Sequence, residues 1–273
     1  MRLTGERPMA GATPDSLLAF HDAGYREMAA RLGPGTVLDI GCGVGDETSR
    51  LADDDRTVLG VDYDADTAVA ASADWGPGSR HGLDVRFAGM DGARLGLRGR
   101  SVDWACSSHI IEHFTAPELH VAELARVLSD SGTTFVITPN RPADFENPFH
   151  VYLFEEPELA SLLRLFFRDV EVWGLEGSEE LKADFASRRA RGEKILKLDV
   201  LRLRHRMPRS WYVWSYERAL PLVYRALGNR GSGIGSGLDE SHFFMTREIV
   251  DTTPGLFAIA RSPRRPTAAI PPR

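Results

Sequence analysis

The stretch VLDIGCGVGDETSRLA, residues 37–52, decides the fold of this 273-residue chain. A short apolar run rich in β-forming residues leads into a glycine-rich turn and then into a helical pattern, which predicts a strand, a tight turn and a helix. The glycines at 41, 43 and 45 have no Cβ, so the backbone can turn sharply and approach a ligand there. The N–H groups at the start of the following helix would point toward that ligand.

Working outward from this turn, helix-length segments separate five further apolar runs, at 56–61, 84–90, 101–107, 133–139 and 169–175. This alternation predicts an α/β fold, with a Rossmann-like, mostly parallel sheet and helices on both faces. After residue 177 the rhythm changes to a helical pattern, and GLFAIAR at 255–261 predicts one last strand.

These patterns divide the chain into four expected parts. Residues 1–177 would form the core domain, including an amphipathic N-terminal helix. A helical insertion or lid over 178–245 would shape the substrate pocket, and 246–262 would return to the sheet as its last strand. The proline-rich end, 263–273, is typical of a disordered tail.

Composition limits the function classes. A net charge of -6 and a pI near 5.8 disfavour a nucleic-acid partner, because such proteins usually carry a basic surface. The cysteines, Cys42 and Cys106, are too few for a disulfide framework, which favours a reducing, cytoplasmic environment. No apolar run reaches the roughly 20 residues of a membrane span, and the first residues contain no apolar leader segment. The sequence does not predict an oligomeric state.

Polar residues stand where the predicted strands end. Asp62 closes the second strand, 21 positions after Gly41, at an offset where an acidic residue accepts hydrogen bonds from ribose hydroxyls. Asp91 follows the third strand and Ser107 closes the fourth. Ligands of open α/β sheets bind outside the carboxyl ends of the strands, so we expect these residues to converge on one crevice.

Five ordered motifs carry a family resemblance. They are VLDIGCGVG, the VD pair at 61–62, the MDG turn, VDWACSSHIIEHF and ELARVLSDSGTTFVITPN. Together, over about residues 30–175, they resemble class I S-adenosylmethionine-dependent methyltransferases of the small-molecule type. The closest likeness is to the broad family that includes ubiquinone and menaquinone biosynthesis methyltransferases. The resemblance implies a seven-stranded sheet whose last strand, here 255–261, is antiparallel.

The resemblance also implies a cofactor, S-adenosyl-L-methionine, and a set of residues that bind it. Asp39 would hold the methionine amino end, Asp62 the ribose, and Tyr63 would lie against the adenine. The complete expected set is Asp39, Gly41, Cys42, Gly43, Gly45, Asp62, Tyr63, Met90, Asp91, Gly92 and Ser107. Carboxylates suit this ligand because it carries an ammonium and a sulfonium and has no phosphate.

Two histidines are candidate catalytic residues. Methyl transfer needs an in-line nucleophile, and a hydroxyl acceptor also needs a base. His113 follows the fourth strand, and His150, in NPFHVY, follows the fifth. The expected reaction is therefore methyl transfer to an oxygen or nitrogen of a small molecule, with a histidine as general base and no metal ion.

Other interpretations stay open. A nicotinamide dehydrogenase is disfavoured because Asp46 stands where its fingerprint requires glycine. His109-Ile-Ile-Glu112-His113 formally matches a zinc-protease signature, which would need a helix. Methylation of RNA or protein, and a regulatory protein that binds the cofactor without catalysis, are further alternatives. The nine Lys and Arg of 188–209 favour a lid helix with a solvated face, although an anionic substrate or a membrane surface would also suit this segment. The aromatic run at 211–216 would suit packing on the core or the wall of a pocket for an aromatic substrate.

Overall fold

A computed structural model describes residues 13–79, 84–144, 149–196 and 237–265. Its helices are α1 (Asp15–Ala29), α2 (Asp46–Ser49), α3 (Ala65–Trp75), α4 (Pro117–Val127), α5 (Glu156–Phe166) and α6 (Glu179–Leu196), with short 3₁₀ helices η1 (Ile111–His113) and η2 (Glu240–His242). Its strands are β1 (Gly35–Ile40), β2 (Arg56–Asp62), β3 (Val85–Gly89), β4 (Val102–Ser108), β5 (Leu128–Pro139), β6 (Phe167–Gly177), β7 (Phe243–Thr246) and β8 (Gly255–Pro263).

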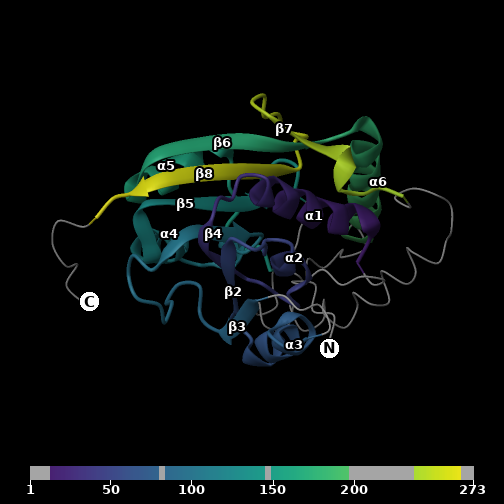
Figure 1. The fold of residues 1–273 in the computed structure, drawn as a ribbon. Helices are drawn as coiled ribbons and strands as arrows, with labels where there is room; N and C mark the ends of the chain where they lie inside the picture. Colours follow the sequence, from purple (N-terminus) through teal and green to yellow (C-terminus); the bar gives the residue numbers. More distant parts are fainter. Residues whose placement is uncertain (1–12, 80–83, 145–148, 197–236, 266–273) are drawn as a thin grey trace.

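One sheet in the order β3-β2-β1-β4-β5-β8-β6-β7 organises the molecule (Figure 1). The strands from β3 to β5 pair in parallel, whereas β8 runs antiparallel to both of its neighbours, β5 and β6. This is the predicted Rossmann-like fold with an antiparallel last strand. The sheet has one strand more than the seven expected, because β7 adds to the edge beside β6.

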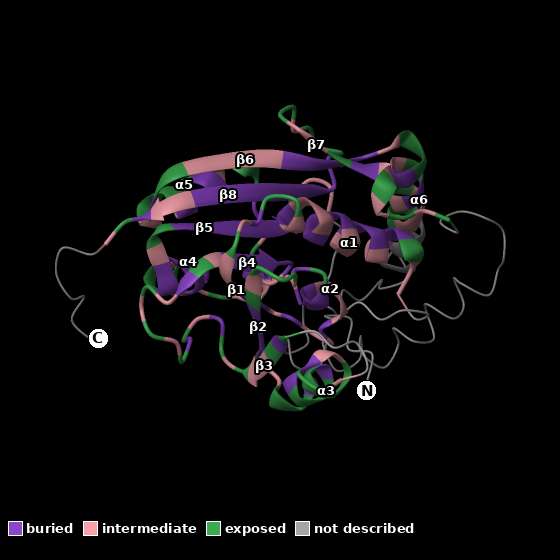
Figure 2. Ribbon diagram, in the orientation of Figure 1, coloured by how far each residue is buried: buried purple, intermediate pink, exposed green. Residues whose placement is uncertain are grey.

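Apolar side chains cover both faces of this sheet, since successive residues of a strand point to opposite sides. On one face, Leu124 of α4 and Leu163 of α5 pack with Leu38 of β1. On the other, Met28 of α1 packs with Val37, the preceding residue of β1. The central strands β5 and β8 are therefore buried along most of their length (Figure 2).

Three segments differ in length from the predicted pattern. The helical pattern after the glycine turn continues through Leu51 in the sequence, but the helix α2 has only four residues. The helical pattern APELHVAELARVLSD covers residues 116–130, but the helix α4 ends at Val127. There β5 begins, because Leu128 already pairs with Val102 of β4. In the expected insertion, α6 is helical, but the chain re-enters the sheet at β7 before reaching β8.

Some predictions lie outside the described residues. These include the aromatic run at 211–216, the Gly/Ser-rich stretch up to 236, most of the basic segment and the end of the tail from 266. Within the described ranges, no helix is both long enough and apolar enough to cross a bilayer.

Candidate functional site

The glycine turn after β1 has the conformation that its sequence predicts. Gly41, Gly43 and Gly45 all have positive φ angles, of 81°, 52° and 85°, in the region that favours glycine. A Cβ at Gly41 would lie 2.3 Å from a side-chain carbon of Ile110, so no larger residue fits there. A Cβ at Gly43, in contrast, would meet nothing within 4 Å, which leaves backbone facing open space. The turn is therefore a cradle with room for a ligand.

Asp62 fixes the neighbouring strand end to this turn. Its carboxylate accepts hydrogen bonds from the backbone N–H of Gly43 at 3.1 Å and of Asp64 at 2.9 Å, and the side chain is buried. The expected ribose-binding carboxylate thus stands directly beside the glycine cradle. The carboxylate holds the turn in place, and its role toward a ribose stays a prediction.

Asp39, at the end of β1, is held by neutral donors. The hydroxyl of Tyr25 donates to both carboxylate oxygens at 3.1–3.2 Å, and the hydroxyl of Thr48 donates to one of them at 2.5 Å. Burial raises the pKa of Asp39 to about 6, against the opposing effect of these hydrogen bonds. Tyr25 therefore has a polar role here in addition to its packing, and it ties α1 to the floor of the site.

A pocket opens above the cradle. It is lined by residues of α1, of α2, of the end of β4 and of the turns after β1 and β4: His21, Tyr25, Gly41, Cys42, Gly43, Val44, Glu47, Ser108, His109 and Ile110. Three of them were predicted to bind the cofactor, whereas Glu47 was missed. Burial raises the pKa of Glu47 to about 7, so this carboxylate gains most from a cationic ligand beside it. A cradle without Cβ atoms and several carboxylates fit a sulfonium and ammonium ligand such as S-adenosylmethionine.

The residues expected to bind the adenine differ in their exposure and in their contacts. Tyr63 is 84% exposed, next to Asp62, and Met90 and Asp91 form the turn after β3. Ser107 does not line the pocket, because its hydroxyl pairs with Nε2 of His120 at 2.9 Å in the buried interior.

His120 was not among the predicted residues, yet it supports this side of the site. Its Nδ1 pairs with the carbonyl of Gly92 at 2.9 Å, so the ring joins the end of β4 to the turn after β3. Burial lowers the pKa of His120 to about 4, which keeps the ring neutral at physiological pH. Ser107 and the turn at Gly92 are therefore joined through the ring of His120.

A cluster of titratable side chains lies where the chain leaves β4. His109 has a positive φ of 53°, which is costly for a residue other than glycine, and its ring lies 4.3 Å from the ring of His21. Nδ1 of His109 approaches the fully buried carboxylate of Glu112 at 3.6 Å. Burial opposes ionisation of Glu112, but its histidine neighbours outweigh this effect and lower its pKa to about 2. The cluster thus contains a buried negative charge.

The two candidate catalytic histidines meet beside this charge. The rings of His113 and His150 lie 5.4 Å apart, and Nδ1 of His113 pairs with the carbonyl of Phe149 at 2.9 Å. Nδ1 of His150 pairs with the carboxylate of Asp144, also at 2.9 Å. Burial alone would lower the pKa of His150, yet the hydrogen bond to Asp144 raises it. The structure thus brings the two histidines together, and their role as a general base stays a prediction.

The zinc-protease interpretation required His109 and His113 on one face of a helix. The segment instead forms the 3₁₀ turn η1, and the ligand atoms that converge come from Glu112, His113 and His150, within 4.8 Å of one another. His150 is remote in sequence from the motif, so the spacing alone did not identify this set.

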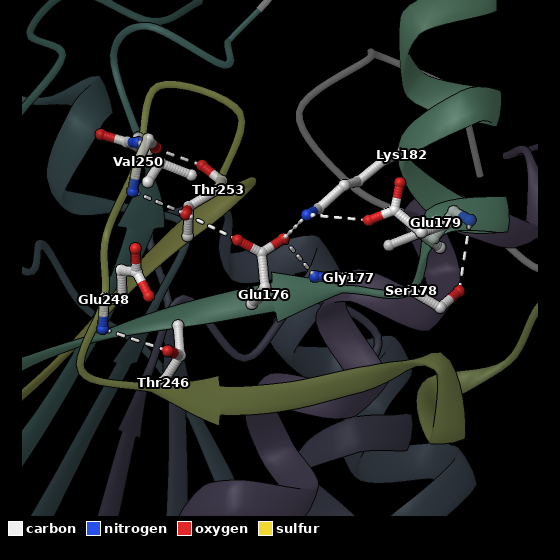
Figure 3. A network of polar contacts seen from close by, with 11 residues as sticks. Glu176, Gly177, Ser178, Glu179, Lys182, Thr246, Glu248, Val250 and Thr253 are labelled. Atoms are coloured by element: carbon white, nitrogen blue, oxygen red, sulfur yellow. Dashed lines mark hydrogen bonds and ion pairs between the residues drawn. The ribbon is translucent and has the colours of Figure 1, made fainter.

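A second polar network lies at the end of β6 and in the loop before β8 (Figure 3). The carboxylate of Glu176, at the end of β6, accepts from the hydroxyl of Thr253 at 2.7 Å and pairs with Lys182 of α6 at 3.2 Å. The amide of Asn140, after β5, donates to the carbonyls of Val250 and Thr253. The loop before β8 is thereby fastened to the strand end that carries the histidine loop.

Comparison with known proteins agrees with this geometry. A family model described as "Methyltransferase domain" matches residues 38–136. A Mycobacterium tuberculosis protein named "probable S-adenosylmethionine-dependent methyltransferase" is 34% identical over 210 residues, which are 74% of this chain and 73% of that protein. A Mycolicibacterium smegmatis protein of the same description is 33% identical over 176 residues, 62% of this chain and 66% of that protein.

Among solved structures, a Thermotoga maritima protein titled as a possible histamine N-methyltransferase superposes with a TM-score of 0.55 at 15% identity. The superposition covers 90% of this chain and 91% of that one. At this identity the likeness concerns the fold alone.

Proposed function

Because this chain belongs to the S-adenosylmethionine-dependent methyltransferases, we propose that it transfers the methyl group to an oxygen or nitrogen of a small-molecule acceptor. The observation that carries this proposal is the position of the histidine pair. His109 and Ile110 line the cofactor pocket, and the chain runs from them directly into Glu112 and His113. An acceptor between the pocket and the histidines would face the cofactor.

When bound, the cofactor supplies an electrophilic methyl carbon on a sulfonium, so the protein has to bind, align and exclude water. Asp62 would hold the ribose, and the glycine cradle would lie beneath the methionine part. Tyr25, on α1, would cover the pocket together with His21. For a hydroxyl acceptor, an imidazole base is the simplest proton acceptor, with His113 and His150 as the candidates, and it would contribute roughly 10²–10⁴-fold to the rate.

Label transfer tests the proposal. Protein incubated with methyl-labelled S-adenosylmethionine and a metabolite extract is expected to move label into small molecules, and far less label into added RNA or protein. Label only in RNA or protein would favour the macromolecular alternative. Tight cofactor binding without any label transfer would favour a regulatory protein.

Substitution tests the acceptor end separately. His113→Ala is expected to lower turnover by roughly 10²-fold or more, while calorimetry with S-adenosylhomocysteine gives an affinity within about twofold of the unchanged protein. The matched control is His242→Ala, a histidine of η2 outside this cluster. Unchanged turnover in His113→Ala would remove this residue from the proposal.

A further inference from the structure

Three side chains at the acceptor end offer ligand atoms to a common point. One atom each of Glu112, His113 and His150 lies within 4.8 Å of the others. Ligands that share one divalent cation at about 2.0–2.2 Å stand roughly 3–4 Å from one another, so only small rotations separate the two arrangements. Two imidazoles and one carboxylate form a donor set that zinc and first-row transition metals favour. We propose that Glu112, His113 and His150 bind one such divalent cation beside the cofactor pocket.

The groups behind the two histidines support this proposal. Nδ1 of His113 pairs with a carbonyl and Nδ1 of His150 with the carboxylate of Asp144, and neither partner can donate. Both Nδ1 atoms must therefore carry the proton, which leaves the lone pair of each neutral ring on Nε2. Histidine ligands of metal ions usually have this arrangement, in which the other ring N–H donates to a carboxylate or a backbone carbonyl.

Glu112 supplies an independent observation. Its side chain is fully buried, and Oε2 accepts a hydrogen bond from the hydroxyl of Thr138 at 3.1 Å. Oε1 has no hydrogen-bond partner among the described residues, and Nδ1 of His109 lies 3.6 Å from it. A buried carboxylate oxygen that accepts no hydrogen bond is costly. A cation in the cluster would satisfy the oxygen that this longer contact leaves without a hydrogen bond.

The backbone brings the distant ligand to this position. The N–H groups of Val151 and Tyr152 both donate to the carbonyl of Glu112, at 2.7 and 3.0 Å. The segment that contains His150 is thus fastened to η1 by main-chain bonds, and His150 itself pairs with Asp144. The ligands are therefore held by the fold and do not depend on a loop closing over the metal.

This inference rests on the proposed function and names the substrate class. Three protein ligands leave coordination positions open, which two neighbouring oxygens of an acceptor, such as a diol or a hydroxy acid, can fill. The cation lowers the pKa of the bound hydroxyl, which loses its proton to water. The oxygen lone pair then forms the new bond to the methyl carbon, and the electron pair of the broken C–S bond remains on sulfur. For such acceptors the cation takes the place of the free imidazole base.

Metal binding can be measured without any acceptor. Untagged protein is stripped with chelator and titrated with Co²⁺, followed by visible absorbance, and with Zn²⁺ by calorimetry. We expect one equivalent to bind. The variants Glu112→Gln and His150→Ala should lose at least tenfold in affinity, and Asp144→Asn should lose about 10–100-fold, as positioning groups behind metal ligands do. The control His242→Ala should bind one equivalent as before.

S-adenosylhomocysteine binding, measured on the same samples, verifies folding and separates the two proposals. Should Glu112→Gln fail to bind it, the half-buried His150→Ala provides the test instead. The metal site is overturned if the stripped protein binds no Co²⁺, or if His150→Ala binds it as tightly as the unchanged protein. In either case, unchanged binding of S-adenosylhomocysteine would leave the methyltransferase proposal standing. Metal binding without S-adenosylhomocysteine binding would support the metal site and would count against the methyltransferase proposal.

Discussion

The proposed cofactor end and the proposed acceptor end of the site are built in different ways. The cofactor end consists of strand ends that follow one another in the sequence, and its shape comes from backbone conformation at Gly41 and Gly43. The acceptor end consists of side chains from separate segments, and its shape comes from contacts such as that between Asp144 and His150. Backbone conformation requires particular residues, such as glycine, at fixed intervals in the sequence, so it can be predicted. Side-chain contacts between loops require no fixed interval, so they cannot.

The comparison also implies that the two ends can be perturbed separately. Substitutions near the glycine turn should change cofactor affinity, and substitutions near η1 or the loop before β8 should change turnover or the KM for the acceptor.

The largest effect is expected at Asp62. The Asp62→Ala variant loses a charged hydrogen-bond acceptor for the ribose and also the acceptor for the N–H of Gly43. Hydrogen bonds to charged groups contribute about 1.5–3 kcal/mol each, so affinity for S-adenosylhomocysteine should fall at least about 100-fold by calorimetry. Asp66→Ala, in the first turn of α3, is the matched control and should stay within about twofold. Unchanged affinity in Asp62→Ala would refute the ribose assignment.

A smaller effect, on stability and on the acceptor, is expected at Thr253. This buried hydroxyl donates to Glu176 and accepts from the N–H of Val250 at 3.0 Å (Figure 3). Thr253→Val leaves both partners unsatisfied, so the free energy of unfolding should fall by about 1–3 kcal/mol in denaturant titrations. The KM for the acceptor should rise because Asn140 binds the same loop.

Cofactor affinity should not change in Thr253→Val if the two ends are independent. Thr246→Val provides the control, since the hydroxyl of Thr246 accepts from the N–H of the exposed Glu248, which water can satisfy. An equal loss in the free energy of unfolding in both variants would show that burial of the hydroxyl does not increase the cost of removing it. A loss of cofactor affinity in Thr253→Val alone would show that the two ends are coupled.

The same contrast explains what the sequence could predict about the fold. The pattern of apolar runs located β1 to β6 and β8, because an apolar run between helix-length segments identifies a strand from the local sequence alone. It did not locate β7, a four-residue strand that exists only because β6 offers an edge to pair with. It extended α4 past Val127, since helical periodicity cannot reveal that Leu128 pairs with a neighbouring strand.

For the site, the glycine turn and Asp62 were predictable because their spacing follows from the βαβ unit. Glu47 was not, because a carboxylate in a predicted helix faces the pocket or the solvent depending on a turn of the chain that the sequence does not specify. The partnership of His150 with Glu112 and Asp144 was also hidden, since it depends on how the segment after β5 folds back onto η1.

The pH dependence of cofactor binding is the finest test of the comparison, because it concerns Glu47 at the cofactor end. Burial raises the pKa of this carboxyl to about 7 in the protein without cofactor, above its unfolded value of 4.5. The α-ammonium group, which S-adenosylhomocysteine shares with the cofactor, favours the ionised carboxylate, so binding should release a proton, and affinity should rise as pH rises through this pKa. If one ionised Glu47 is required, its population and hence the affinity for S-adenosylhomocysteine increase about tenfold between pH 6 and pH 8.

Calorimetry in two buffers of different ionisation enthalpy measures both the affinity and the proton release. Glu47→Gln should flatten the profile, whereas Asp66→Asn, in the first turn of α3, should keep it. The ligand offers a second control: 5′-methylthioadenosine lacks the ammonium, so its affinity should change little with pH in either protein. A steep profile for 5′-methylthioadenosine, or an equally steep profile in Glu47→Gln, would mean that the titrating group acts on the adenosine part. The methionine end would then have to be held by Asp39 alone, whose carboxylate is already engaged by Tyr25 and Thr48.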